Sequence, residues 1–292
     1  WRRAIHAALL DRLQGARAVG LDLIFAESDT VNPNDDRILA DSIRRNGHTV
    51  LPIVLDRLAN PSAIAAPIPI LAQAAASSGF INARVDSDGV VREATPATDF
   101  SGERRFHLAL SMLTVGGQPD KAQQLLQRAG PDGNILIPYA GSTAHMRTVS
   151  YLSVLRGDVP AEALRGKYVL VGAWATGLGD AYPTPVSHDL SGMSGVEIIA
   201  NLLQAARDDV SYLRPAPAWN ALFSALPVLL ACLALWRLSP KRALLVSVAL
   251  IAAILLASWM LLAHAYLWFA PTAALVGVAL CYPLWSWRSQ EA

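Results

Sequence analysis

The segment after Leu213 limits the possible folds of this chain more than any other feature, because it is almost free of charge. No Asp, Glu, Lys or Arg occurs between Arg242 and Arg288. A bilayer core about 30 Å thick is crossed by a helix of about 20 apolar residues. Three apolar stretches approach this length, at about 218–236, 243–262 and 265–287. We therefore predict three transmembrane helices. The alternative for the last two, one very long buried helix in a soluble protein, is much the weaker.

The basic residues near these stretches predict how the helices are oriented. The first connection carries Arg237, Lys241 and Arg242, whereas the second, around His264, carries no fixed charge. Short loops rich in Lys and Arg stay in the cytoplasm. We therefore expect residues 1–213 outside and the C-terminus in the cytoplasm. In a bacterium this describes a multi-pass protein of the inner (cell) membrane with a periplasmic domain.

The front part of the chain has the charge content of an ordinary globular domain. The whole chain is only 16% charged, against about 25% in a typical soluble domain. Five of the 24 basic and one of the 23 acidic residues follow Leu213, which leaves 19 basic and 22 acidic residues before it, a net charge of −3. We expect no nucleic-acid partner, since such a partner needs a basic face. Both cysteines, Cys232 and Cys281, lie in the apolar stretches, so the front part has neither a disulfide nor a thiolate site.

Alternating helical and extended patterns in residues 1–213 predict an α/β domain. Helical spacing at 2–15 and 35–45 alternates with apolar runs at 18–24 and 49–55, which are typical of strands covered on both faces. This order favours a mostly parallel or mixed sheet with flanking helices. Further elements are expected as a helix at 70–77, a hairpin of 80–85 with 90–97, helices at 106–115 and 121–127, a strand at 135–139, a strand at 167–172 with the clearest buried pattern, and a helix at 195–206.

We therefore divide the chain into an extracytoplasmic domain, 1–213, and a membrane domain, 214–292. Because the chain begins with Trp1 rather than Met, a signal peptide or an N-terminal membrane helix could have preceded it.

Two loops near the expected sheet are candidates for a binding site. Asp22 stands near the C-terminal end of an apolar strand, and in open parallel sheets ligands bind outside those ends. The strand at 167–172 leads into a glycine-rich loop that contains Gly177 and Asp180. Backbone N–H groups in such a loop can hold an anion, although the spacing is not that of a P-loop. The alternative is structural, with Asp22 capping a turn and Asp180 fixing the loop through backbone hydrogen bonds.

Four further residues are weaker candidates for contact with a ligand. Thr184 follows the glycine-rich loop in a proline-fixed segment, and Arg92 on the return strand of the hairpin either pairs with a carboxylate or meets an anionic ligand. Glu197 and Asn201 are four residues apart and share one face of the last helix, which leads to the membrane. The alternative for these two is an ordinary solvated helix face.

Taken together, these pieces resemble the second class of CHASE domains, the extracellular sensory domains associated with cyclases and histidine kinases. The motifs appear in the family's order, as Gly20-Leu-Asp-Leu-Ile-Phe25, Asp86-Ser-Asp-Gly-Val-Val-Arg92, Leu164-Arg-Gly-Lys-Tyr-Val-Leu-Val-Gly172, Leu178-Gly-Asp180 with Thr184-Pro185, and Gly195-Val-Glu-Ile-Ile-Ala-Asn201. The resemblance covers about residues 1–210, and the three following helices fit the family's layout. One departure is Ile199, where the family often has a His.

The resemblance implies a sensor of an unknown small-molecule or protein stimulus that feeds a cytoplasmic output domain. Histidine kinases, nucleotide cyclases, diguanylate cyclases and Ser/Thr kinases are the outputs implied, and none of them follows Arg288 in this sequence. Since such outputs generally work as dimers, we expect a homodimer with the first and last helices of the outer domain near its interface.

Two rival functions are a membrane-anchored hydrolase with Asp22 and Asp180 as paired carboxylates, and a structural or partner-binding anchor. Against the hydrolase, the sequence has no G-x-S-x-G elbow and no H-E-x-x-H motif. Its six histidines have no metal-ligand spacing. We therefore expect neither an enzyme activity in this chain, nor a cofactor, nor a metal site.

Overall fold

The computed structural model describes residues 1–56, 63–173, 181–187 and 192–291. The chain forms two compact units, Trp1–Ser211 and Tyr212–Ala292. We call them the outer unit and the membrane unit and describe each by itself.

The outer unit contains helices and strands in the alternating order of an α/β domain. Its helices are α1 (Arg3–Arg12), α2 (Pro33–Asn46), α3 (Pro69–Ala74), α4 (Leu108–Val115), α5 (Pro119–Gln127), α6 (Tyr151–Arg156), α7 (Ala161–Leu164) and α8 (Gly195–Arg207). Its strands are β1 (Ala18–Asp22), β2 (Thr49–Asp56), β3 (Ala63–Ala65), β4 (Ser77–Phe80), β5 (Glu93–Ala94), β6 (Ala97–Phe100), β7 (Glu103–Phe106), β8 (Ile135–Leu136), β9 (Tyr168–Gly172), β10 (Ala181–Tyr182) and β11 (Met193–Ser194).

A five-stranded mixed sheet forms the centre of the outer unit. Strand β1 lies between β2 and β9 and is parallel to both, with Gly20 opposite Val50 and Leu170. Strand β4 is parallel to β2, whereas β3 pairs with the end of β2 in the antiparallel sense. The sheet and its flanking helices confirm the predicted α/β class, and the sheet is mixed rather than purely parallel.

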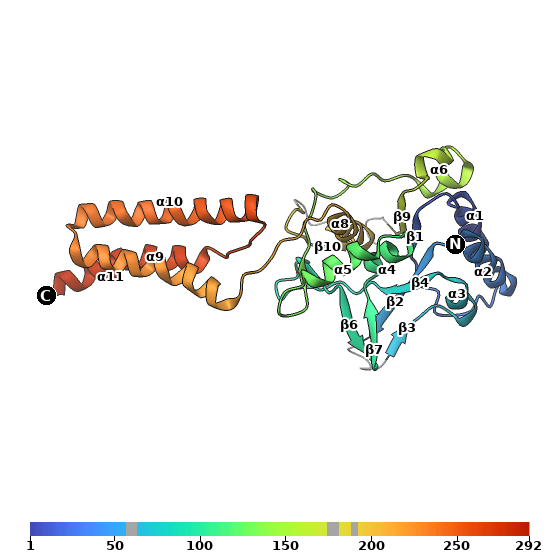
Figure 1. Cartoon of the computed structure of the whole chain (residues 1–292), viewed down its shortest axis with the longest axis horizontal. Helices are drawn as coiled ribbons and strands as arrows, with labels where there is room; N and C mark the ends of the chain where they lie inside the picture. The colour runs from blue at the N-terminus through green and yellow to red at the C-terminus, as the bar shows by residue number, and fades with distance from the viewer. Residues whose placement is uncertain (57–62, 174–180, 188–191, 292) are drawn as a thin grey trace. The chain divides into compact units, whose positions relative to one another are not determined.

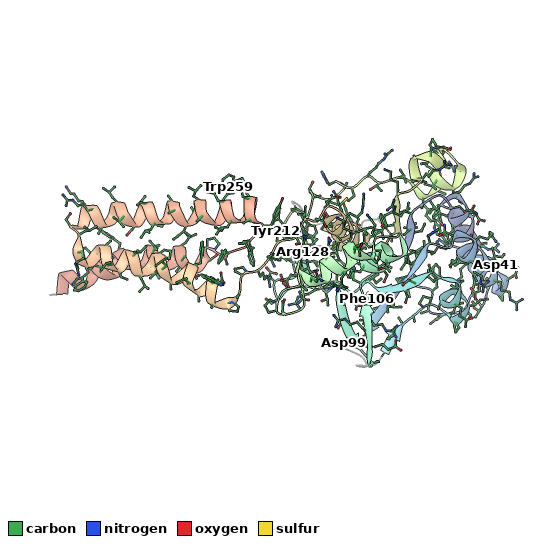
Figure 2. The ribbon with its side chains drawn as sticks, viewed as in Figure 1. Asp41, Asp99, Phe106, Arg128, Tyr212 and Trp259 are labelled. Carbon is green, nitrogen blue, oxygen red and sulfur yellow. The ribbon has the colours of Figure 1, made fainter. Side chains whose placement is uncertain are left out.

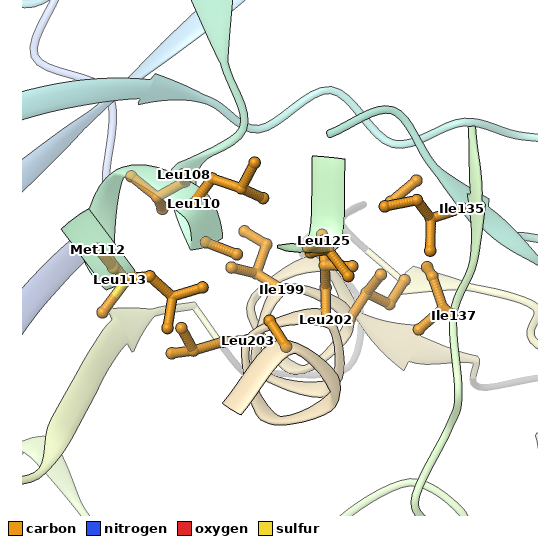
Figure 3. Close-up of a cluster of buried hydrophobic side chains, with 14 of the residues drawn as sticks. Leu108, Leu110, Met112, Leu113, Leu125, Ile135, Ile137, Ile199, Leu202 and Leu203 are labelled. Carbon is orange, nitrogen blue, oxygen red and sulfur yellow. The ribbon is translucent and has the colours of Figure 1, made fainter. Parts of the chain in front are cut away.

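Two apolar clusters cover the two faces of this sheet. Figure 1 shows α1, α2 and α3 on one side of β1, β2 and β4, and α4, α5 and α8 on the other. Alternate residues of β2 enter the two clusters, Leu51 on the first side and Val50 on the second, as the two-residue period of a strand requires. We call these sides the α1 face and the α8 face. Figure 3 shows the core of the α8 face, where leucines of α4 meet Ile199, Leu202 and Leu203 of α8.

Close approach between α4 and the sheet depends on glycines. A Cβ atom added to Gly79 would lie 2.6 Å from the Cα atom of Leu108, and one added to Gly20 would lie 2.5 Å from the Sδ atom of Met112, also on α4. Real Cβ atoms do not tolerate such distances to backbone, so a side chain at Gly79 would push α4 away from β4.

Several predicted elements of the outer unit need correction. The predicted helix at 70–77 ends at Ala74, and Ser77 begins β4 by pairing with Val50. The predicted strand at 167–172 is present as β9, but it is not the most buried strand. All its residues are half-buried, because β1 is its only partner among the described strands.

The predicted hairpin around residues 86–89 was right in its turn and wrong in its strands. The Gly89 N–H donates to the Asp86 carbonyl at 2.9 Å, so the turn forms. The flanking segments keep one antiparallel bridge, Arg84 to Glu93, and form no longer ladder, because residues up to Phe80 pair with β2 and β5 pairs with β8. The true hairpin is β6–β7, labelled at Asp99 and Phe106 in Figure 2. Its turn has Ser101 and Gly102 at φ of 53° and 80°, the left-handed pair that a tight two-residue hairpin turn requires.

The membrane unit consists of α9 (Pro217–Arg237), α10 (Pro240–Ala265) and α11 (Thr272–Glu291). Two of these helices are long and apolar enough to cross a bilayer, Pro217–Arg237 and Lys241–Ala265. The third is apolar over Thr272–Pro283, and its predicted start at residue 265 is wrong. The chain leaves α10 at Tyr266 with a left-handed φ of 54° and resumes a helix only at Thr272.

Many large apolar side chains of the membrane unit are exposed, whereas the contacts between its helices combine alanines with branched aliphatic residues. Trp259 is 61% exposed and projects away from α10 in Figure 2. The shared core contains Ala231, Ile254, Ala274 and Val278. Small residues at helix contacts and large apolar ones outside are typical of helices surrounded by lipid.

Candidate ligand site

A small cavity lies at the carboxyl ends of the parallel strands of the outer unit. Asp22 ends β1, and Ile81 and Asn82 follow β4, so the cavity stands at the edge of the sheet where ligands bind in open α/β folds. Its volume is about 40 Å³, room for about three water molecules. The lining residues are Asp22, Ile81, Asn82, Ala83, Arg84, Val91, Glu93, Ala94, His107, Ile137, Tyr182, Gly195, Ile198 and Ile199.

One wall of the cavity holds a buried ion pair. The side chain of Glu93 is only 2% exposed, and its Oε2 atom lies 3.0 Å from the Nε atom of Arg84. Strand β5 places Glu93 there by pairing with β8, while a single bridge joins Arg84 to Glu93 across the turn. A carboxylate this deeply buried needs a positive partner, and Arg84 brings that charge from the more exposed side.

His107 contributes a neutral imidazole to the cavity lining. It is the N-cap of α4, and its Nδ1 atom accepts a hydrogen bond of 3.3 Å from the Ala109 N–H. Burial lowers the pKa of His107 to about 4, so the ring is uncharged at neutral pH. Because Nδ1 is an acceptor, the proton of the neutral ring is on Nε2. The ring also meets Phe80 edge to face.

Asn82 lines the cavity, but its side chain is hydrogen-bonded to the backbone of β2. Its Oδ1 atom accepts the Leu55 N–H, and its Nδ2 atom donates to the Leu55 carbonyl, both at 2.9 Å. The side chain therefore continues the pairing of β2 beyond the end of β4. This holds the segment after β4 in place beside the cavity.

Helix α8 forms the remaining wall through Gly195, Ile198 and Ile199. Ile199, the residue that departs from the resembled family's His, is 4% exposed and belongs to the core of the α8 face. At this position the chain therefore presents an apolar group to the cavity.

Glu197 and Asn201 share a face of α8 as predicted, but that face is buried rather than solvated. The Asn201 Oδ1 atom accepts the Ala140 N–H at 2.9 Å, and the Glu197 Oε1 atom accepts the Ala144 N–H at 2.7 Å. Ala144 has a left-handed φ of 67°, which is unfavourable for a residue with a Cβ. The two side chains thus fasten residues 140–144 to α8. Within the described part of the chain, the buried Glu197 Oε2 atom has no hydrogen-bond partner.

The other predicted site residues do not line the cavity or lie outside the described residues. Arg92 donates to both Asp86 and Asp88 at 2.9 Å, which lowers the pKa of Asp88 to about 2. Thr184 is buried, and its hydroxyl lies 2.8 Å from that of Ser187. Gly177 and Asp180 fall within 174–180, outside the described residues.

Sequence reasoning missed most of the polar lining. Arg84, Glu93, His107 and Tyr182 were not singled out, although two of them left a local signal. Glu93 is a charged residue within a segment expected to be a strand, Val90-Val91-Arg92-Glu93-Ala94. His107 stands just before an apolar helix, at the position where capping residues occur. Asp22 was found because the end of a parallel strand is a general binding position.

The lining has the chemistry of a small polar binding site. A carboxylate at Asp22, the Arg84–Glu93 pair and the neutral His107 offer donors and acceptors within an apolar surround. Among the described residues, no three His, Cys, Asp or Glu side chains gather as a metal site would need. The arrangement can hold a few polar atoms by hydrogen bonds.

The fold defines an α/β domain that is followed in the chain by helices apolar enough to cross a membrane. The CHASE2 domain family matches residues 1–239, and the chain belongs to this family. CHASE2 domains are extracellular sensory domains and not catalytic ones. The matched range includes the outer unit and continues through α9. Neither a curated protein nor a solved structure matches the chain.

Proposed function

We propose that this chain is the stimulus-sensing input module of a transmembrane signalling receptor. The outer unit receives the stimulus outside the cytoplasm, and three membrane helices couple it to a cytoplasmic kinase or nucleotide cyclase. The observation that carries the proposal is the position of α8. This helix forms one wall of the cavity and leads within ten residues of its end, Arg207, to the start of α9 at Pro217.

The cavity is the proposed point of action, because a change there reaches α8 directly. Ile198 and Ile199 line it, and eight of the residues of α8 are buried in the core. A packed helix moves as a body rather than deforming residue by residue. A tenfold shift between two positions of α8 needs about 1.4 kcal/mol of differential affinity, and one charged hydrogen bond supplies about 1.5–3 kcal/mol.

Asp22 is the proposed ligand contact that lines the cavity, with Gly177 and Asp180 on the neighbouring loop. Thr184, Glu197 and Asn201 would then act through the segments they hold, whereas Arg92 would only fix the turn at residues 86–89 through Asp86 and Asp88.

Helix α5 supports the proposal by holding the exit from α8. Lys121 forms an ion pair with Asp209. Arg128, labelled in Figure 2 at the end of α5, donates to the Asp209 carbonyl at 2.7 Å and to the Ser211 hydroxyl at 3.3 Å. Asp209 has a left-handed φ of 57°. These contacts fix the chain just before it enters the membrane unit, so that movement of α8 is passed on rather than absorbed by a loose linker.

The test compares Asp22→Asn with Arg92→Gln in the full-length receptor with its output domain, in native membranes. Asp22→Asn keeps the shape of a cavity residue and removes its charge, whereas Arg92→Gln changes a charge outside the cavity. We expect the first variant to change output activity or stimulus dependence by about tenfold and the second to leave both unchanged. Thermal melting checks that both variants are folded. If both then show the same output activity and stimulus dependence, the site lies elsewhere.

Topology and assembly are part of the proposal. A cysteine introduced at residue 60 should react with an impermeant reagent from outside, and one at residue 240 should not; the opposite result would invert the topology. A homodimer with α1 and α8 near its interface should cross-link in membranes. Because α8 is mostly buried, its contribution is confined to the half-buried strip of Val196, Ala200 and Gln204 and to the exposed Arg207 at its end. Only monomer after cross-linking at physiological expression would reject the dimer.

A further inference from the structure

The only two cysteines of the 292-residue sequence meet in the membrane unit. Cys232 is on α9 and Cys281 on α11, 49 positions apart, and their Sγ atoms are 3.6 Å apart. Both are free thiols. Their contact joins the first and third helices of the unit.

The packing of α9 against α11 explains why these two side chains meet. A Cβ atom added to Gly277 of α11 would collide with the Val228 side chain of α9. Gly277 and Val228 each stand one helical turn before Cys281 and Cys232, so the two contacts share one register of parallel helices. Glycine at such a contact lets two membrane helices approach closely. The thiols therefore lie on facing sides of a tight helix pair.

We propose that Cys232 and Cys281 form a reversible disulfide that locks α9 to α11, with a lipid-soluble quinone as the oxidant. Two S–H bonds break and one S–S bond forms. The two electrons and two protons reduce the quinone to its hydroquinone. A quinone suits the position of the pair, because Cys232 is exposed on the outer surface of an apolar unit, where an oxidant dissolved in lipid can reach it.

Closing the bond requires only a small local change. In the reduced state the Cys281 Sγ–H donates to the Gly277 carbonyl at 3.1 Å. That hydrogen bond would be given up as Sγ turns to Cys232. Disulfides need Cα atoms within about 7 Å, which the close approach at Gly277 favours.

A covalent link between α9 and α11 would act on the coupling between the outer unit and the output domain. Helix α9 continues from the outer unit, and α11 is the last membrane helix of the chain. Sliding or rotation of one past the other would be blocked while the bond is closed. The redox state would thus set whether the helices can respond, whatever ligand acts on the outer unit.

The test counts free thiols in the full chain, reconstituted in lipid nanodiscs and first reduced. After incubation with a short-tailed ubiquinone analogue, the protein is denatured and reacted with a maleimide mass tag. We expect the wild-type chain to pass from two tags to none without accumulating a one-tag form, and dithiothreitol to restore both. Cys232→Ser and Cys281→Ser should each keep their one tag under the same conditions.

A matched control moves one thiol to the neighbouring face of α11. The double variant Cys281→Ser with Leu280→Cys keeps two cysteines at nearly the same depth, but Leu280 is 52% exposed and faces outward. Its oxidation should be at least about tenfold slower, because a cysteine at position 280 faces away from Cys232 and the pair lacks the geometry that a disulfide needs. Equal rates in the control and the wild type would overturn the proposed contact. A bond that closes with copper–phenanthroline but not with the quinone would overturn the quinone step, and two tags under both oxidants would overturn the pair itself.

Discussion

The two faces of the central sheet differ in how their buried polar groups are hydrogen-bonded. On the α1 face, aliphatic side chains of α1, α2 and α3 fill the core, and the buried polar groups are hydrogen-bonded. The Ser42 hydroxyl donates to the Ala7 carbonyl at 2.8 Å, and the Asn46 amide holds Leu13 and Thr49. The buried carboxylates of this face, Asp35 and Asp36, are paired with Arg2 and Arg3 of the N-terminal segment. On the α8 face, the buried ionisable groups are Glu93, His107 and Glu197, and the Glu197 Oε2 atom has no hydrogen-bond partner among the described residues.

This difference separates stability from response. A buried carboxylate such as Glu197, whose Oε2 atom has no hydrogen-bond partner among the described residues, costs free energy, and a fold tolerates it where it serves another purpose. The α1 face supplies the stability that offsets this cost. The α8 face, with its cavity and the helix that leads to the membrane, is where a ligand or a proton can change the balance.

The largest expected effect tests the α1 face. Leu10 is fully buried between α1 and the rest of that core, so Leu10→Ala should lower the free energy of unfolding by about 2–5 kcal/mol. Leu152→Ala on α6, where the side chain is 44% exposed, is the control and should change it by less than about 0.5 kcal/mol. Hydrogen exchange of β1 and β2 peptides, followed by mass spectrometry in detergent, measures both variants. If folded Leu10→Ala receptor also responds differently to the stimulus, the separation of the two faces is wrong.

The α1 face is also the part that the sequence predicts best. Its strands are continuous apolar runs and its helices have regular apolar spacing, so local pattern alone places α1, β1, α2 and β2. The ends of these elements differ by only a few residues from expectation. The long apolar membrane helices α9 and α10 are predicted for the same reason.

The α8 face is harder to predict because its contacts join distant segments. Glu93 is buried only because β5 pairs with β8, more than 40 positions along the chain. Glu197 and Asn201 look like a solvated helix face until residues 140–144 are laid on them. No local pattern carries these contacts, so the cavity could be located through Asp22 but not described. The β6–β7 hairpin was not predicted, although its Ser101-Gly102 turn contains a residue pair suited to such a turn.

Protonation of His107 should distinguish the α8 face from the α1 face by its effect on stability. Its pKa is about 4 in the folded state and about 6.5 in the unfolded chain. The neutral ring is therefore favoured by folding, and stability is fully present above pH 6.5. As pH falls from 6.5 to about 4, only the unfolded chain takes up the proton, and up to about 3 kcal/mol is lost. His107→Asn keeps an N-cap acceptor and should lose this part of the pH dependence. Scanning calorimetry of both proteins between pH 7 and 4.5 makes the comparison, and equal pH dependence would show that burial of His107 does not set it.

The smallest expected effect concerns Arg92, which lies beside the α8 face without lining the cavity. Its guanidinium group pairs with Asp86 and Asp88 at the exposed turn, and exposed pairs contribute little to stability. Arg92→Gln should therefore shift the Tm by less than about 3 °C. The local effect is larger, because the pKa of Asp88 is held at about 2 mainly by its hydrogen bond to Arg92. This depressed pKa stabilises the turn above the ordinary pKa of Asp, and the contribution is lost as pH falls through about 2. In the variant, NMR titration of the Asp88 carboxyl should show its pKa returning toward the ordinary value. A large fall in Tm would mean instead that the turn at residues 86–89 supports the cavity wall at Glu93. Arg92 would then belong to the α8 face although it does not line the cavity.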